Sequence, residues 1–391
     1  MTSQVAVANH SGVAVASDTV TTSYVEGGTK TIGNSHKIWE IGTGHRVLVL
    51  HSGAVTQNGV TLKLLLNEWS TTLSKPLDTL EDYVDSYITW MNRERNIHTQ
   101  ESELNRVQYL LNDHYYEVKK RSEDLWYSIP LEEEQFTSRE IILTDFAQKG
   151  LDYLENLPLN TGVRDDEEFV ELINHEKIDI EEKINYIFSD VGLNDENRAI
   201  LVNSAALVLS RAQQFPMSST LAFVGFGNQE YFAGNIRLKS TGFYGGKFIY
   251  DKSERYSVHP EAGSTISAFA QDEAIFGFIR GIRWEVMNHI VDTVAEKIND
   301  SITNPDGENL GEEIAEQVRE SVKDFCYRRL TSPMLNSIEG LDLGHLANLA
   351  ESLVGMEATS AFGGDGPATV GGYIEVATID RQHGVVWVKA L

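Results

Sequence analysis

The stretch TSQVAVANHSGVAVASD, residues 2–18, decides the fold. It holds two short apolar runs, Val5–Ala8 and Gly12–Ala16, joined by the turn pair Ser11-Gly12. Short β-branched runs separated by turn residues are typical of hairpins. Two further runs of the same kind follow at residues 37–41 and 46–50. We therefore predict that the chain opens with an antiparallel sheet.

Beyond this sheet, the pattern changes along the chain between helical and strand character. Helical periods are predicted from about residue 55 to 90, through the acidic stretch 91–215, and at about 273–300, 311–329 and 341–357. Strand character returns at 220–226, 230–234, 247–250 and 264–268, and the chain closes on strands at 373–379 and 385–388. This order fits two sheets packed between helical layers, and no internal repeat divides the chain.

Composition and charge exclude several classes of protein. The 391 residues are 41% hydrophobic and 23% charged, as in an ordinary globular protein. The net charge of −26 repels phosphate backbones and anionic lipids, so we expect neither nucleic acid nor a membrane as a partner. The one cysteine, Cys326, cannot form an internal disulfide, and no leader pattern precedes the first strand, so a cytoplasmic location is expected.

Thr2 is the candidate nucleophile. Removal of Met1 would leave a free α-amino group on Thr2, and its pKa of about 7.7 to 8.0 lets it accept the proton of the hydroxyl on the same residue. Such a site also needs a cation, a carboxylate and a backbone donor for an oxyanion. Lys37 at the next strand, Asp18 across a hairpin, and Gly53, where the fourth strand is expected to meet a helix, are the candidates.

These motifs resemble those of proteasome β subunits and their bacterial HslV-like relatives, which are N-terminal-nucleophile (Ntn) hydrolases. The motifs are residues 2–7 and 12–18, Asn34-Ser35-His36-Lys37-Ile38, His51-Ser52-Gly53, the strand from Ser264 into a helix at Gly277, and Val370–Ala377 after the last helix.

The resemblance implies one α+β domain over residues 1–391. Its core would be a four-layer αββα sandwich of two antiparallel sheets, made of about 2–80, 216–283 and 338–391. Residues 81–215 would form an acidic helical insertion and residues 284–337 a second helical insertion.

By the same resemblance, Thr2 attacks a carbonyl carbon and its own amine is the base. Lys37 tunes that amine, Asp18 orients Lys37, and the Gly53 amide holds the oxyanion. His51, with Thr21 and Val55, would line the substrate pocket.

One supporting residue of the family is missing. A serine that hydrogen-bonds the amine in the family is replaced by Ala270, and the residues before the glycine pair Gly371-Gly372 also differ. Asp365, Thr369 and Gln271 are the candidates to supply the missing hydrogen bonds.

No metal or other cofactor is expected. His36 and His51 flank the proposed site, but the chain has no His-Glu-x-x-His or Cys-x-x-Cys spacing. The glycines of residues 363–366 lack the lysine and the hydroxyl residue of a phosphate-binding loop.

The sequence thus predicts a threonine peptidase that cleaves amide bonds of peptides or proteins through an acyl-enzyme. Two alternatives stay open: a catalytically inactive structural subunit, which Ala270 favours, and a ligase that passes the acyl group to an amine. Relatives assemble into rings, so the resemblance implies a homo-oligomer. The sequence does not specify whether the two predicted insertions permit the same ring contacts. The substrate and any unfoldase partner are not specified by the sequence.

Overall fold

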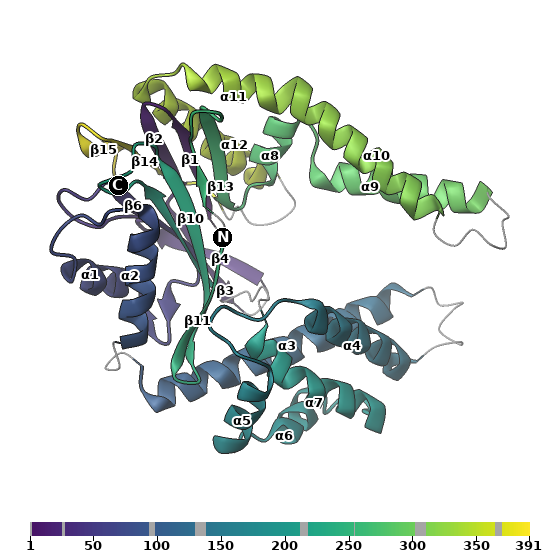
Figure 1. Ribbon diagram of the computed structural model, residues 1–391. Helices are drawn as coiled ribbons and strands as arrows, with labels where there is room; N and C mark the ends of the chain where they lie inside the picture. The colour runs from purple at the N-terminus through teal and green to yellow at the C-terminus, as the bar shows by residue number, and fades with distance from the viewer. Residues whose placement is uncertain are drawn as a thin grey trace.

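The chain is a mixed α/β protein with several antiparallel sheets (Figure 1). The computed structural model describes residues 2–25, 28–93, 98–129, 138–211, 218–253, 255–301, 310–363 and 370–391.

The first sheet has five strands in the order β13-β1-β2-β14-β15, each antiparallel to its neighbour. Every residue of β1 and β2 is buried, which explains why both strands read as near-continuous Val/Ala runs. The bounds are β1 Ser3–Asn9, β2 Gly12–Asp18, β13 Ser264–Ala270, β14 Ile374–Asp380 and β15 Gly384–Lys389. The predicted opening hairpin is present, with Asn9 opposite Gly12.

The second sheet has the order β11-β10-β9-β6-β5, with β12 also paired to β10. Its strands are β5 Ile38–Glu40, β6 Val47–Gly53, β9 Ser219–Gly225, β10 Gly234–Tyr244, β11 Lys247–Lys252 and β12 Tyr256–Ser257. The remaining strands form two separate two-stranded sheets: β3 Val20–Val25 with β4 Gly28–Asn34, and β7 Thr56–Gln57 with β8 Val60–Thr61.

An apolar layer joins the inner faces of the two sheets. Alanines such as Ala6 and Ala377 from the first sheet pack there with Leu48, Leu50 and Ala222 from the second. Alternate residues of the same strands point outward, because successive side chains on a strand face opposite sides. Val5 and Val7 pack under helix α12, Leu343–Phe362. The first sheet therefore has an apolar inner face and an apolar outer face.

Helices cover both outer faces. On the first sheet lie α12, α8 Glu273–Arg280 and α11 Ser332–Glu339. On the second sheet lie α1 Leu62–Thr71 and α2 Leu80–Arg93, whose Trp69 and Tyr87 pack against Phe223. Helix α2, which extends across the predicted boundary at residue 81, thus packs on the second sheet. Helix α11, which begins within the predicted insertion 284–337, packs on the first sheet.

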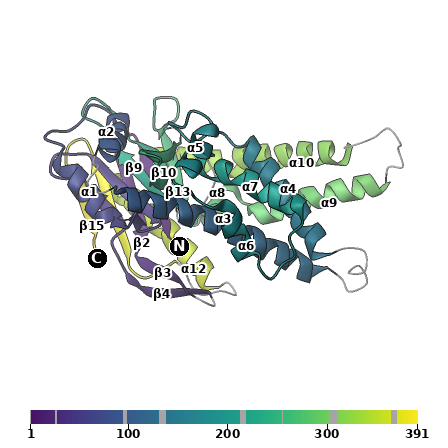
Figure 2. The ribbon, with the colours of Figure 1, turned by 90° about the horizontal axis from the view of Figure 1, so that it is seen from below.

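Two groups of helices project from the sheets. One consists of α3 Gln100–Ser128, α4 Arg139–Asn156, α5 Glu167–His175, α6 Ile180–Ile187 and α7 Asp195–Ser210, and it has a hydrophobic core of its own that also includes Tyr244 and Ile249. The other is the pair α9 Trp284–Ser301 and α10 Leu310–Cys326, followed by a π-helical turn, η3 Tyr327–Thr331. Both groups extend to the same side of the sheets in two perpendicular views (Figures 1 and 2).

The helix expected from about residue 55 begins only at Leu62. The hairpin β7-β8 precedes it, turning at Asn58 and Gly59, which have φ values of 48° and 83°. Asn-Gly with both residues at positive φ forms the two-residue turn favoured in hairpins. The Thr61 hydroxyl then accepts the Leu64 amide and caps the helix.

The predicted extents of two other elements were also wrong. The helix predicted for 273–300 is divided into α8 and α9 by Gly281, which has a left-handed φ of 74°. Residues 230–233 lie outside any strand, and β10 begins only at Gly234. The Glu230 carboxylate there accepts the amides of Gly227 and Leu80. No helix within the described residues is long and apolar enough to cross a membrane.

Candidate active site

Thr2 lies at the start of β1 and is only 6% exposed. Its carbonyl oxygen accepts the Gln271 amide at 2.8 Å, which continues the pairing of β1 with β13. The next amide, that of Ser3, donates to Oδ1 of Asp18 at 3.0 Å. The peptide unit that links Thr2 to Ser3 is therefore held from both sides.

Asp18 and Lys37 form a buried ion pair. Lys37 Nζ lies 2.8 Å from Asp18 Oδ1, the same oxygen that accepts the Ser3 amide. Lys37 Nζ also donates to the Val20 carbonyl at 2.7 Å. One carboxylate oxygen thus joins the lysine to the residue after Thr2, so the structure brings Lys37 and Asp18 together beside the start of β1.

The glycine pair 371–372 fixes the other side of Asp18. The Gly371 amide donates to Asp18 Oδ2 at 3.2 Å, and the Gly371 carbonyl accepts the amides of Thr19 and Val20. A side chain on Gly372 would approach Asn34 Oδ1 to 2.8 Å, and its φ of 75° also favours glycine. The close approach of Asn34 and the positive φ explain the glycine at position 372.

Burial and charge act in opposite directions on Lys37. Burial lowers the pKa of its amine below the usual range, while the carboxylates of Asp18 and Glu375 oppose this decrease. Both side chains of the pair are almost fully buried, so the ion pair lies in a poorly screened environment. The charge on Lys37 therefore has a strong local electrostatic effect.

Two supporting residues, Gln4 and Glu375, were not predicted as part of the site. The Glu375 carboxylate accepts the Lys37 amide at 3.2 Å and lies 2.5 Å from Nδ1 of His36. The Gln4 side chain donates to the His51 carbonyl at 2.9 Å, linking β1 to β6. Polar residues inside otherwise apolar strands were the available signal, because such residues are seldom buried without partners.

Gly53 ends β6 in a left-handed conformation, with φ 81°. A β-carbon there would come within 2.1 Å of the Ser218 carbonyl oxygen, so only glycine fits. Our expectation that a helix opens at Gly53 was wrong, because β7 and β8 separate it from α1 at Leu62. A helix dipole therefore does not act on the Gly53 amide.

The three pocket candidates have different environments. His51 is buried, its Nε2 lies 3.3 Å from the Ala54 carbonyl oxygen, and its Nδ1 has no hydrogen-bond partner among the described residues. Burial lowers the pKa of His51 to about 4. Val55 is 52% exposed, whereas the Thr21 hydroxyl is paired with that of Ser35 at 2.8 Å. Exposure thus favours Val55 over Thr21 for direct contact with a ligand.

Ala270, opposite Ser3, has a φ of 66°, a backbone conformation that is costly for alanine. Of the three candidates for the missing hydrogen bonds, Gln271 contacts Thr2 through its backbone amide. Asp365 and Thr369 lie outside the described residues.

The carboxyl of Asp272 follows Gln271, and its pKa is raised to about 6, chiefly by burial and also by the charge of Glu357. Glu357 accepts the Ala274 and Ile275 amides at the start of α8. Two acidic side chains therefore lie together where the first sheet meets α8.

No group of three or more His, Cys, Asp or Glu side chains within the described ranges is arranged to hold a metal ion.

Comparison with known proteins adds little to this geometry. No family model matches the chain, and no curated protein matches it. Among solved structures, the chain is similar to a Gly-1 mutant of Anbu from Hyphomicrobium sp. strain MC1. The identity is 9%, the alignment covers 100% of this chain and 85% of the other, and the TM-score is 0.24. Such a likeness carries no argument about the fold or function of this chain.

Proposed function

We propose that the mature protein is an N-terminal threonine hydrolase, a proteasome-like peptidase on an αββα fold of the Ntn-hydrolase type. The observation that carries the proposal is the contact pattern of Asp18. Its Oδ1 accepts both the Lys37 ammonium and the amide that follows Thr2. A buried cation fixed beside the first strand is what a nucleophile that uses its own amine requires.

The mechanism begins with removal of everything that precedes Thr2. The Thr2 hydroxyl oxygen attacks the substrate carbonyl carbon, and its proton moves to the α-amine of the same residue. The Gly53 amide would stabilise the oxyanion, and the amine would return the proton to the leaving amide nitrogen. Water then attacks the acyl-enzyme ester, which releases the acid and restores the hydroxyl. Lys37 stays protonated throughout and favours the neutral form of the nearby amine.

Ala270 supports a second candidate, an inactive structural subunit of the same architecture. Its methyl group cannot hydrogen-bond the Thr2 amine, and its left-handed φ of 66° shows that the chain keeps a strained backbone there. The buried ion pair alone would be retained in such a subunit for structural reasons, so chemical reactivity decides between the two candidates.

Intact-mass measurement combined with a covalent probe tests the proposal. We expect the purified chain to begin at Thr2 and to form one adduct with a peptide epoxyketone, which requires both a hydroxyl and a free amine. The Thr2→Ala variant should form none, and Thr2→Ser should retain partial labelling. A chain that begins at Thr2 and stays unlabelled would favour the structural subunit, and a product joined to an added amine would indicate transfer in place of hydrolysis.

A further inference from the structure

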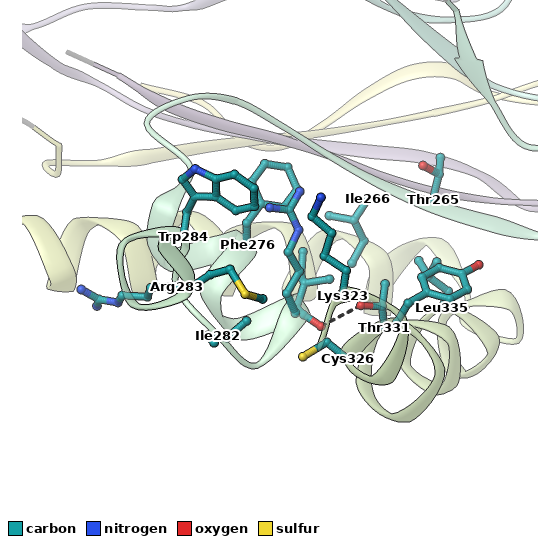
Figure 3. A pocket seen from close by; sticks show the side chains of 14 residues that line it. Thr265, Ile266, Phe276, Ile282, Arg283, Trp284, Lys323, Cys326, Thr331 and Leu335 are labelled. Carbon is teal, nitrogen blue, oxygen red and sulfur yellow. Dashed lines mark hydrogen bonds between the residues drawn. The ribbon is translucent and has the colours of Figure 1, made fainter. Parts of the chain in front are cut away.

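A cavity of about 620 Å³ lies on the helical side of the first sheet, away from the Asp18–Lys37 pair. Its walls come from β13, α8, the start of α9, the end of α10 and η3 (Figure 3). This volume is in the range of small-molecule binding sites. The proposed peptidase activity assigns no role to this cavity.

Most of the wall is apolar. Figure 3 shows Trp284, Phe276 and Ile266 gathered around the cavity, with Ile282 and Leu335 at its sides. The only hydrogen bond drawn joins the Thr331 hydroxyl to the Ile279 carbonyl at 3.1 Å, which satisfies that hydroxyl internally. A ligand would therefore contact mainly hydrocarbon and aromatic surface.

The charged side chains of the wall all have the same sign. Arg280, Arg283 and Lys323 line the cavity, and no acidic side chain is among the described residues that form its wall. This is unexpected in a chain with 58 acidic and only 32 basic residues. Asp272, Glu273 and Glu285 line an adjoining hollow, which Arg280 and Arg283 also line. The cavity is therefore a local cationic site in an acidic protein.

Arg280 differs from the other two in its contacts, although its charge also acts on the nearby Asp272 carboxylate. Its guanidinium lies 4.5 Å from the centre of the Phe276 ring and makes no hydrogen bond or ion pair with the described part of the chain. Lys323 is 2.7 Å from Glu320 Oε1, and Arg283 donates to the Ser360 hydroxyl at 3.4 Å. Arg280 is thus available to bind an anion at the edge of an apolar cavity.

We propose that this cavity binds a single-chain carboxylate of the medium-chain fatty-acid class. Its hydrocarbon chain would lie among Phe276, Ile282 and Met287, and its carboxylate would pair with Arg280 beside Lys323. An inorganic anion would leave the apolar wall uncovered, and a neutral apolar ligand would leave Arg280 unpaired. A ligand with an apolar chain and one terminal carboxylate satisfies both parts of the wall.

Cys326 provides a direct reporter, because it lines the cavity and is the chain's one cysteine. We expect decanoate, below its micelle concentration, to slow modification of Cys326 by a maleimide and to give a saturable signal in calorimetry. Octanoate is two methylenes shorter than decanoate and should bind roughly tenfold more weakly, since each buried methylene contributes about 0.8 kcal/mol. Prior modification of Cys326 should block decanoate binding.

The role of the carboxylate is tested with decanol and Arg280→Gln. Decanoate should bind the unmodified protein roughly tenfold more tightly than decanol, as a charge-assisted hydrogen bond predicts. In Arg280→Gln this preference should disappear. Arg121→Gln, which removes the same charge from an exposed position on α3, is the matched control and should keep it.

Several results would overturn the proposal. They are unchanged Cys326 modification at saturating decanoate, equal affinity for decanoate and decanol, or binding only of a peptide with an apolar carboxyl-terminal residue. Thr2→Ala should bind decanoate as the unmodified chain does. Decanoate binding without peptidase activity would therefore contradict only the proposed function. Peptidase activity without decanoate binding would contradict only this inference.

Discussion

The Nζ atom of Lys37 lies 2.8 Å from Oδ1 of Asp18, and both side chains are almost completely buried. A buried ion pair contributes little net stability, because desolvation offsets the attraction between its charges. Removing one partner is different, since it leaves an unpaired charge in the interior. The pair is held by backbone amides at Ser3 and Gly371, so its geometry is tied to both edges of the site.

Replacing Lys37 with methionine should therefore reduce both stability and reactivity. We expect a loss of about 3 kcal/mol in the free energy of unfolding, measured by denaturant titration. Epoxyketone labelling of Thr2 should fall by about a hundredfold or more, as for loss of one catalytic electrostatic group. Lys389→Met, which breaks a surface pair with Glu351, should cost less than about 1 kcal/mol. Unchanged stability in Lys37→Met would contradict the buried pair.

Local patterns in the sequence were enough to predict the opening hairpin. Val and Ala runs with a turn at Ser11-Gly12 predicted β1 and β2, because strand burial and turn chemistry are both local properties. The Asn58-Gly59 pair is itself a strong turn signal. The predicted helical period nevertheless included it, although the helix begins only at Leu62. Propensity over a long window therefore obscured a two-residue turn.

The parts of the site that were missed depend on contacts between distant residues. Glu375 reaches the Lys37 amide across 338 positions of sequence. The left-handed conformation of Ala270, which pairs with Ser3, was likewise not predicted, since alanine carries no preference for positive φ. Residue type and spacing cannot specify such contacts, which arise only when the sheet is assembled.

Ala270→Gly should stabilise the protein. At φ 66° an alanine loses about 1 kcal/mol or more relative to glycine, which adopts this region freely. The gain is partly offset by the larger entropy of glycine in the unfolded chain, so we expect a net increase of about 0.5 to 1 kcal/mol in the free energy of unfolding. Ala268→Gly, in the same strand, is the control and should destabilise. A decrease in Ala270→Gly would contradict the left-handed conformation.

Ala270→Ser tests whether a hydroxyl beside Ser3 improves the site. If the amine of mature Thr2 lacks a hydrogen-bond partner there, a serine should increase the rate of epoxyketone labelling by about fivefold, the equivalent of one net hydrogen bond. Stability should change little, since serine shares the cost of positive φ. Labelling at the original rate would indicate that another group already supports the amine.

Acid should destabilise the folded protein through His51. Its folded pKa is lowered to about 4 from 6.5, so the unfolded chain binds the proton first. Stability should thus fall as the pH decreases from 6.5 to about 4 and then stay level, with a total of roughly 3 kcal/mol from this histidine. His114, whose pKa is also lowered to about 4, adds a similar slope. His51→Gln should remove about half of the pH dependence of the unfolding free energy that His51 and His114 contribute together. If this pH dependence is unchanged in the variant, His51 is in contact with water and its pKa is not lowered.

Glu357→Gln should lower the pKa of Asp272 without displacing α8. A glutamine oxygen can still accept the amides of Ala274 and Ile275, whereas the negative charge that helps to raise the Asp272 pKa to about 6 is removed. Burial is the larger cause of that elevation, so the pKa should stay above the ordinary value of 3.8. Carboxyl NMR titration, with Asp272→Asn to assign the signal, measures the shift.

Between pH 3.8 and 6 the folded chain binds more protons at Asp272 than the unfolded chain does, so this group makes stability fall as the pH rises. The fall should be smaller in Glu357→Gln, and a titration midpoint that does not move would show that the two carboxyls act independently.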